Sequence, residues 1–206
     1  MMKVTAHAGC QDKPLDGLDY IFEAIKFNVD IIELDVRFYN GVPVLSHDPI
    51  YEGKNLVTVE QALNIIEPHC SICINYDMKE ALPIDSLIDV ICKTNMQNRG
   101  ITTGCKLLVN DIIKLRNIGI DYFSIDVDVT KLNDIHYCEQ LANTVVESSY
   151  GGINIDYRYV NAQIIDVMKR NNKLVFVWTV DDYNDIVRLK QLGVNSITTN
   201  KLEYLK

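Results

Sequence analysis

The sequence is short of positive charge. It contains 28 acidic residues against 20 lysines and arginines, which gives a formal net charge of −8 at pH 7. Proteins that bind nucleic acids gain much of their affinity when Lys and Arg side chains displace counterions from the phosphate backbone. An acidic chain gains nothing from this source, so the composition argues against nucleic acid as a partner. Anionic membrane surfaces are disfavoured for the same reason.

Long apolar segments are missing too. The chain has no run of about 18 apolar residues that could cross a bilayer, and "MMKVTAHAGC" has no apolar core before a cleavage site. We therefore expect no signal peptide, no stable membrane insertion and a cytoplasmic location. In that compartment cysteines stay reduced, so free thiols are expected. The six cysteines are Cys10, Cys70, Cys73, Cys92, Cys105 and Cys138.

The sequence also lacks the second cysteine pair that would complete a structural zinc site. The stretch "HCSIC" places Cys70 and Cys73 at a zinc-like spacing beside His69. No other pair exists, however, and Cys73 leads into a predicted strand. We therefore interpret the cysteines as small buried apolar residues.

Low-complexity segments and linkers rich in Pro, Gly or Ser are absent. Instead, eight β-branched runs alternate with amphipathic, helix-like segments along the chain. The runs are 3–8, 30–38, 71–78, 101–105, 121–129, 151–156, 173–180 and 195–199. Such alternation predicts parallel strands joined by helical crossovers. Eight repeats predict one domain over residues 1–206, a compact (β/α)8 TIM barrel.

The alternative fold is an open, doubly wound parallel sheet. That fold usually carries a glycine-rich phosphate loop after its first strand. Here the corresponding stretch, "AHAGCQDKPLDG", contains no G-x-G-x-x-G motif. The barrel is therefore favoured.

Several residues mark the expected helix boundaries. The helix-like segments are 18–28, 58–66, 83–94, 110–119, 131–148, 161–172 and 181–193. The first of them places Leu18, Ile21, Phe22 and Ile25 on one face. Thr58, Asn110 and Asn161 are candidate N-caps, Gln61 completes a capping box with Thr58, and Gly119 and Gly193 fit helix C-termini.

One hairpin interrupts the alternation. "RFYNGVPVLSHD" contains Asn40-Gly41, a dipeptide that accepts positive φ in a tight turn. The second strand is therefore expected to fold back and to return His47 to the place where that strand ends.

Polar residues stand out because strands of a parallel barrel are covered on both faces and should be mostly apolar. Side chains alternate between faces, so Glu33, Asp35 and Arg37 share one face. Three further polar sets share faces near the C-terminal ends of their strands, where barrel active sites lie. They are Asn75, Asp77 and Lys79; Ser124, Asp126 and Asp128; and Asn154 and Asp156.

Converging carboxylates repel one another, and burying one without a partner costs several kcal/mol. A divalent cation is one remedy, and carboxylate oxygens suit Mg²⁺ or Ca²⁺. The other is a network of ion pairs with Arg37, Lys79 or another cation. From the residues alone, both interpretations of Glu33 and Asp35 stay open.

Two histidines are expected near the same acids. His7 ends the first predicted strand beside Gly9, and His47 follows the hairpin. An imidazole titrates near neutral pH, so two of them can act as acid and base on opposite sides of one bond. We interpret His69 and His136 as surface residues.

Together these residues resemble the glycerophosphodiester phosphodiesterase family. The matching stretches are "HAG", "IIELDV", "NGVPVLSHD", "INYDMK" and the late "VWTV…LGVNSITT", in order along nearly the whole chain. The resemblance implies a TIM barrel that hydrolyses glycerophosphodiesters to an alcohol and glycerol 3-phosphate with a divalent cation. It assigns acid–base catalysis to His7 and His47, metal binding to Glu33, Asp35 and Asp77, and substrate contacts to Lys79 and Trp178.

The chain also departs from the family pattern. Ala8 stands where the family has a phosphate-gripping arginine, "PLDG" replaces P-E-N-T, and Asp77 replaces a glutamate. The segment after His47 is short, which leaves the cleft either more open or completed by a second copy of the chain. Two alternatives to hydrolysis follow: a repurposed barrel that binds a phosphorylated metabolite, or a phosphodiesterase that forms a cyclic phosphate.

Overall fold

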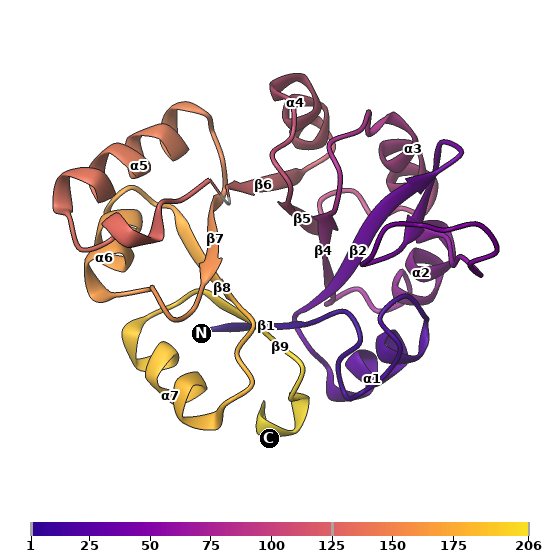
Figure 1. Cartoon of the computed structure of the whole chain (residues 1–206), viewed down its shortest axis with the longest axis horizontal. Helices are drawn as coiled ribbons and strands as arrows, with labels where there is room; N and C mark the ends of the chain where they lie inside the picture. Colours follow the sequence, from indigo (N-terminus) through magenta and orange to yellow (C-terminus); the bar gives the residue numbers. More distant parts are fainter. Residues whose placement is uncertain (1, 125, 206) are drawn as a thin grey trace.

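The computed structural model describes residues 2–124 and 126–205 and shows a closed parallel barrel (Figure 1). Its strands are β1 (Lys3–Ala6), β2 (Ile31–Tyr39), β3 (Val42–Leu45), β4 (Cys73–Met78), β5 (Gly100–Gly104), β6 (Ile120–Ser124), β7 (Gly152–Asp156), β8 (Leu174–Trp178) and β9 (Ser196–Thr199). The sheet order is β1-β9-β8-β7-β6-β5-β4-β2-β3, and β1 also pairs with β2. That pairing closes the barrel, as the sequence predicted, with β3 outside the ring as an antiparallel arm.

The helices form an outer layer around the strands (Figure 1). They are α1 (Asp19–Phe27), α2 (Val59–Ile66), α3 (Asp85–Lys93), α4 (Val109–Asn117), α5 (Ile135–Glu147), α6 (Ala162–Arg170) and α7 (Tyr183–Leu192). Two short 3-10 helices are η1 (Val129–Lys131) and η2 (Leu202–Leu205). Within the described ranges, the last barrel strand is followed by η2 instead of an α-helix.

Most of the predicted helix ends are confirmed. Thr58 and Gln61 form the full capping box of α2, and the Asn161 side chain accepts a hydrogen bond from the backbone of Ile164 in α6. Gly193 ends α7 in the left-handed conformation. The prediction for Asn110 is wrong, because α4 already begins at Val109 and Asn110 lies within its first turn.

Two other expectations differ from the structure. Phe22 is 47 % exposed, because α1 buries Tyr20, Ile21 and Ala24 instead. The cysteines are free as expected, but Cys70 is exposed and only Cys10 and Cys138 are fully buried. The six cysteines therefore do not form a uniformly buried set.

Strand ends at the barrel mouth were predicted too long. The run 121–129 forms a strand only to Ser124; Ile125 lies outside the described residues, and Asp128 caps η1 through its side chain. Likewise, β1 ends at Ala6, so His7 lies in the loop that follows.

The Asn40–Gly41 hairpin is confirmed. β2 and β3 pair antiparallel, with Tyr39 opposite Val42, and both turn residues have positive φ, 50° at Asn40 and 78° at Gly41. This is the geometry of a tight hairpin turn. The returning arm carries His47 back from the end of β2 to the level of Asp35, whose carbonyl accepts a hydrogen bond from the Ser46 N–H at 2.9 Å.

Apolar side chains fill both sides of the sheet. Two large clusters lie between strands and helices, and a small cluster of Ile31, Phe123 and Phe176 fills the lower part of the lumen. The lumen is therefore a packed core at its base. Polar residues on the same strand faces lie above this apolar floor, toward the mouth.

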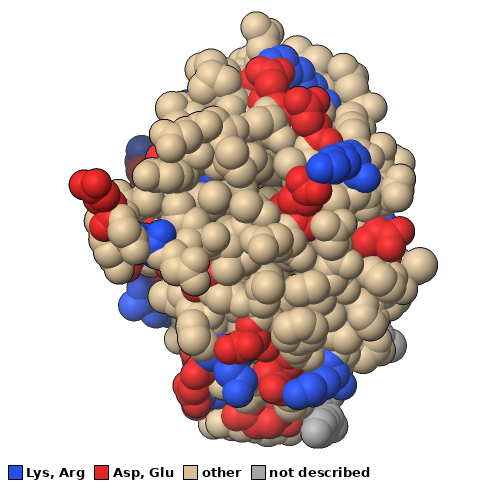
Figure 2. Space-filling view, turned by 90° about the vertical axis from the view of Figure 1, so that its right-hand side faces the viewer, with Lys and Arg blue, Asp and Glu red and all other residues tan. Residues whose placement is uncertain are grey.

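The outer surface carries charges of both signs. On the side covered by α1, α2 and α3, acidic and basic side chains are intermixed (Figure 2). Some of them form ion pairs, such as Lys93 with Glu60 at 2.6 Å between α3 and α2. Among the described residues, no helix has the length and apolarity needed to cross a membrane.

Arg99 provides a test of the opposite, N-terminal end of the barrel. Its guanidinium donates to the carbonyls of Glu67, His69 and Ile72 at 2.8–2.9 Å, where α2 ends and β4 begins. Arg99→Met should lower the free energy of unfolding by about 2 kcal/mol, because several carbonyls lose a charged donor. Urea denaturation measures this. Arg116→Met, at an exposed arginine, serves as the control and should change stability little.

Candidate active site

Three carboxylates meet at the mouth of the lumen because of strand register. β2 and β4 pair so that Glu33 lies opposite Asn75 and Asp35 opposite Asp77. Alternation then turns these side chains to the lumen, as predicted. Glu33, Asp35 and Asp77 each offer an oxygen within 4.8 Å of the others.

Burial makes this acidic group costly. Glu33 and Asp35 are only 6 % and 1 % exposed. Burial, with the charges of Asp77 and Asp35 adding to it, raises the pKa of Glu33 well above its usual value. Burial also raises the pKa of Asp35, although the Lys79 ammonium opposes the shift. Both acids are therefore poorly solvated as anions.

Lys79 supplies one positive charge to the group. Its Nζ lies 2.9 Å from Asp35 Oδ1 and even closer to Asp77 Oδ2. Burial lowers the pKa of Lys79, but Asp77 and Asp35 outweigh that effect and raise it above its usual value. The ion-pair interpretation of the sequence is thus confirmed for Lys79, whereas Arg37 pairs with Glu80 instead.

The donor set also fits a divalent cation. One ammonium cannot balance three carboxylates, so two negative charges remain when all are ionised. Both oxygens of Asp35 are buried; Oδ1 lies 2.9 Å from the Lys79 ammonium, whereas Oδ2 has no hydrogen-bond partner among the described residues. Such an orphaned oxygen is unusual in proteins. An all-oxygen cluster of this kind suits Mg²⁺ or Ca²⁺.

The side chains of Asn75 and Thr103 connect Glu33 to Asp77. Asn75 Nδ2 donates to Glu33 Oε2 at 2.9 Å, and Thr103 Oγ1 lies 2.9 Å from both Asn75 Oδ1 and Asp77 Oδ1. Thr103 is 1 % exposed and Asn75 is 2 % exposed. Sequence reasoning placed Asn75 on the right face but missed its role. It missed Thr103 altogether, because the register of β5 carries no sequence signal.

His7 lies beside the acids as predicted. Its Nε2 is 3.6 Å from Glu33 Oε1, and its Nδ1 is 2.9 Å from Asn200 Oδ1. Asn200 is held in turn by Asp181. Neither Asn200 nor Asp181 was predicted, since each follows a different strand far along the chain.

His47 lies at the same rim on the returning arm of the hairpin. Its N–H donates to Asp16 Oδ1 at 2.8 Å, its carbonyl accepts from Arg37, and its Nδ1 lies 2.9 Å from Asp48 Oδ1. The backbone of this exposed residue is therefore fixed from two sides. The remaining expectation, that His69 and His136 are surface residues, is confirmed.

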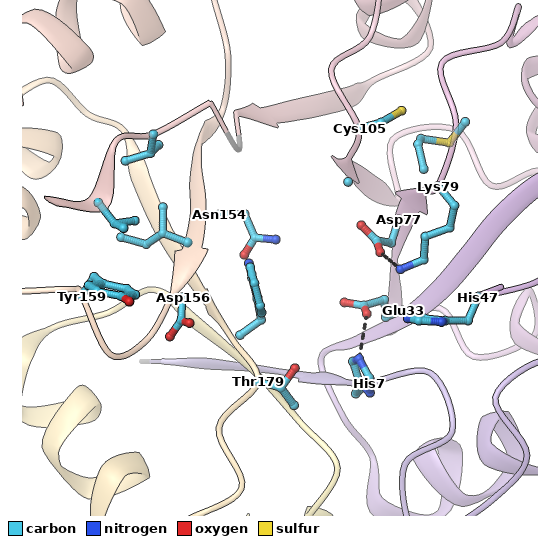
Figure 3. A pocket seen from close by; sticks show the side chains of 16 residues that line it. His7, Glu33, His47, Asp77, Lys79, Cys105, Asn154, Asp156, Tyr159 and Thr179 are labelled. Atoms are coloured by element: carbon cyan, nitrogen blue, oxygen red, sulfur yellow. Dashed lines mark hydrogen bonds and ion pairs between the residues drawn. The ribbon is translucent and has the colours of Figure 1, made fainter. Parts of the chain in front are cut away.

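These groups line one cavity of about 660 Å³. Figure 3 shows two facing walls: the acids, Lys79 and both histidines on one side, and the β7–β8 side on the other. The second wall contains Val127, Val129, Asn154, Asp156, Tyr159 and Trp178. Trp178, 43 % exposed, thus lies on the cleft wall where it was predicted. The cavity can hold a molecule with one charged and one larger, partly apolar part.

No second strong cation faces the cavity among the described residues. Among the described residues, Lys79 is the only Lys or Arg that lines it, and Ala8 is fully buried in the hydrophobic core. Arg158 is exposed, and its Nε and Nη2 donate to Asp156, whose carboxylate raises the Arg158 pKa. Asp16 of "PLDG" accepts from the His47 backbone and pairs with Lys54 at 2.6 Å, outside the acidic group.

One comparison with known proteins identifies a family. The model of the glycerophosphoryl diester phosphodiesterase family matches residues 50–204, which include Asp77, Lys79 and Trp178 but not the residues of β1 and β2. No curated protein matches the sequence significantly.

Solved structures resemble the whole fold. An Oleispira antarctica phosphodiesterase bound to its product sn-glycerol-3-phosphate has a TM-score of 0.79 at 14 % identity, covering 98 % of this chain and 95 % of that chain. A glycerophosphodiester phosphodiesterase from Parabacteroides distasonis gives 0.74 at 18 %, covering 98 % and 94 %. One from Agrobacterium tumefaciens gives 0.75 at 14 %, covering 99 % and 98 %. At these identities the likeness establishes the fold.

Gly104 tests how tightly Asp77 is held. It ends β5 with φ +87°, and a Cβ there would lie 2.2 Å from the Met78 carbonyl and 2.7 Å from Asp77 Oδ1. Gly104→Ala should therefore cost about 3 kcal/mol of stability, from left-handed strain plus overpacking. Thermal or urea unfolding measures it.

The hairpin glycine supplies the matched control. Gly41 has φ +78°, and a Cβ added there would meet nothing within 4 Å. Gly41→Ala should therefore cost only the backbone strain, about 1 kcal/mol. Equal losses in the two variants would contradict the tight packing of Asp77 against Gly104.

Proposed function

Because the chain belongs to the glycerophosphoryl diester phosphodiesterase family of phosphoric diester hydrolases, we propose that it hydrolyses glycerophosphodiesters to an alcohol and glycerol 3-phosphate. The observation that carries the proposal is one cavity in which two histidines flank the Glu33–Asp35–Asp77 group. The product-bound Oleispira antarctica relative supports the choice of substrate class.

Glu33, Asp35 and Asp77 are the proposed ligands of one divalent cation, Mg²⁺ or Ca²⁺. A cation bound there supplies Lewis-acid stabilisation of negative charge on phosphoryl oxygens. Lys79 adds a second positive charge from the same wall of the cavity. Its pairing with Asp35 and Asp77 fixes its direction before substrate arrives.

His7 and His47 are the proposed acid and base. The attacking oxygen must lose a proton and the leaving alkoxide must gain one, and each imidazole can serve one of these transfers. Both rings line the same cavity, yet separate loops hold them, after β1 and after β3. Trp178 and Tyr159 form the facing wall, which would contact the alcohol part of the diester.

A second function is favoured by one specific observation. With Ala8 buried and Lys79 as the single Lys or Arg lining the cavity among described residues, the phosphate has few fixed donors. The alternative is a barrel that binds a phosphorylated metabolite without turnover. A third outcome keeps the chemistry but gives a cyclic phosphate, by attack of a neighbouring substrate hydroxyl.

A double histidine variant tests catalysis. His7→Ala/His47→Ala should lower glycerol 3-phosphate release from a panel of glycerophosphodiesters by about 10²- to 10⁴-fold, because the variant lacks both the proposed acid and the proposed base. Release is assayed with Mg²⁺, Ca²⁺ or Mn²⁺, with and without a chelator, and phosphorus NMR identifies the product. His69→Ala/His136→Ala, at two exposed histidines, is the matched control and should keep full activity.

The outcomes separate the three functions. Glycerol 3-phosphate that disappears with chelator and with the double variant supports hydrolysis. A cyclic product supports the third function. Tight binding without turnover for any metal and any diester, unchanged in the double variant, would establish the binding protein and reject the enzyme.

Thr103 provides a test of cation binding that needs no substrate. Thr103→Val keeps the side-chain shape but removes the hydroxyl between Asn75 and Asp77. Loss of such a supporting partner usually weakens metal affinity by about 10- to 100-fold. Calorimetric titration of Mg²⁺ or Ca²⁺ measures it.

Thr102 is the natural control. It is the preceding residue of β5, fully buried, and its hydroxyl has no hydrogen-bond partner among the described residues. Thr102→Val should leave cation affinity unchanged. If Thr103→Val also binds the cation as tightly as the unmodified protein, the proposed support of the ligands is wrong.

A further inference from the structure

Asn200 and Asp181 form a hydrogen-bonded chain behind His7. The three residues follow neighbouring strands: His7 follows β1, Asn200 follows β9, and Asp181 follows the end of β8 by a short loop. The His7 N–H bonds to the Thr199 carbonyl at 3.0 Å, so the β1–β9 register sets His7 beside Asn200. The arrangement spans 193 positions of sequence between His7 and Asn200.

Asp181 determines which way the Asn200 amide faces. Its Oδ2 lies 2.8 Å from Asn200 Nδ2, and its Oδ1 accepts from the Asn200 N–H at 2.7 Å and from Thr199 Oγ1 at 3.2 Å. A carboxylate only accepts hydrogen bonds. The NH2 group of Asn200 must therefore face Asp181, which leaves its Oδ1 facing His7.

The same reasoning continues to the imidazole. Asn200 Oδ1 is 2.9 Å from His7 Nδ1 and can only accept, so Nδ1 must carry the hydrogen. In a neutral ring the other nitrogen, Nε2, is then unprotonated. Nε2 lies 3.6 Å from Glu33 Oε1, beyond hydrogen-bond length, so its lone pair remains available at the cavity.

We propose that Asn200 and Asp181 are positioning residues that fix His7 in its Nδ1–H tautomer, so that Nε2 faces the cavity as a proton acceptor. This role deepens the proposed hydrolysis and rests on it for its purpose, but the tautomer itself is a property of the resting protein. Free neutral histidine favours the opposite, Nε2–H form. The protein must therefore impose the arrangement through Asn200.

Histidine tautomers can be observed directly. In full-length protein labelled with ¹⁵N in its histidines, long-range proton–nitrogen NMR distinguishes protonated from unprotonated ring nitrogens. The measurement is made at about pH 8.5, about two units above the ordinary histidine pKa of about 6.5, without metal or substrate. The His7 signals are identified by their loss in His7→Gln. We expect a protonated Nδ1 and an unprotonated Nε2.

Asp181→Asn is the decisive variant. It keeps shape and the Oδ1 acceptor for the Asn200 N–H, but it presents an NH2 group to Asn200. The Asn200 amide should then turn over and direct its own NH2 to His7 Nδ1, which converts His7 to the Nε2–H tautomer. Asn200→Ala should also shift His7 toward Nε2–H. Asn184→Ala, at an exposed asparagine of α7, should leave the tautomer unchanged.

Activity supplies a second readout. With the wrong tautomer, kcat should fall by about 10²-fold or more while KM changes little; misfixing the tautomer of a catalytic histidine costs about 10⁴-fold in a serine protease. A His7 ring that carries its hydrogen on Nε2 in the unmodified protein would overturn the proposal. So would an unchanged tautomer in Asp181→Asn.

The experiments can reject the positioning role and the proposed hydrolysis independently of each other. If the tautomer is Nδ1–H and switches in Asp181→Asn, but the unmodified protein releases no product, the positioning role stands and the proposed hydrolysis is rejected. If product is released by protein whose His7 is Nε2–H, the hydrolysis stands and the positioning role is rejected.

Discussion

The site depends on the register between β2 and β4 above an apolar floor. Because Asp35 lies opposite Asp77, and Glu33 opposite Asn75, the lumen faces of two strands bring three acids together. The floor of Ile31, Phe123 and Phe176 keeps water from reaching them from below. Charge repulsion among the three carboxylates and the cost of their desolvation are then both large. The other polar groups at the mouth offset these costs; they are Lys79, the Asn75–Thr103 pair and the two histidines.

The parts of this arrangement that follow from local sequence were predictable. A period of two along a strand tells which residues share a face, so the order of residues alone places Glu33 with Asp35 and Asp77 with Lys79. The Asn40–Gly41 dipeptide determines a turn by its own backbone preference, so the return of His47 was predictable too. The eightfold alternation of strands and helices indicated the barrel.

The parts that depend on contacts between distant strands were not predictable. Thr103 meets Asp77 only because β4 and β5 pair in one register, and Asn200 meets His7 only because β1 pairs with β9. An isolated Thr or Asn in the sequence has no pattern that distinguishes it from a surface residue. The failed N-cap at Asn110 shows the same limit on a small scale, because α4 has Leu108 at its N-cap position, two residues earlier than predicted.

Because Ala8 is uncharged, the proposed cation would also have to attract the anionic substrate. The acids and Lys79 together retain negative charge, and a phosphodiester is itself an anion, so bare electrostatics would repel the substrate from this wall. With an arginine beside His7, a fixed guanidinium could offset that repulsion. Here the methyl group of Ala8 packs into the hydrophobic core, and Lys79 is already engaged with Asp35 and Asp77. In the proposed function the cation would therefore have to attract the substrate as well as stabilise its transition state, and binding and catalysis would then depend on the same three carboxylates.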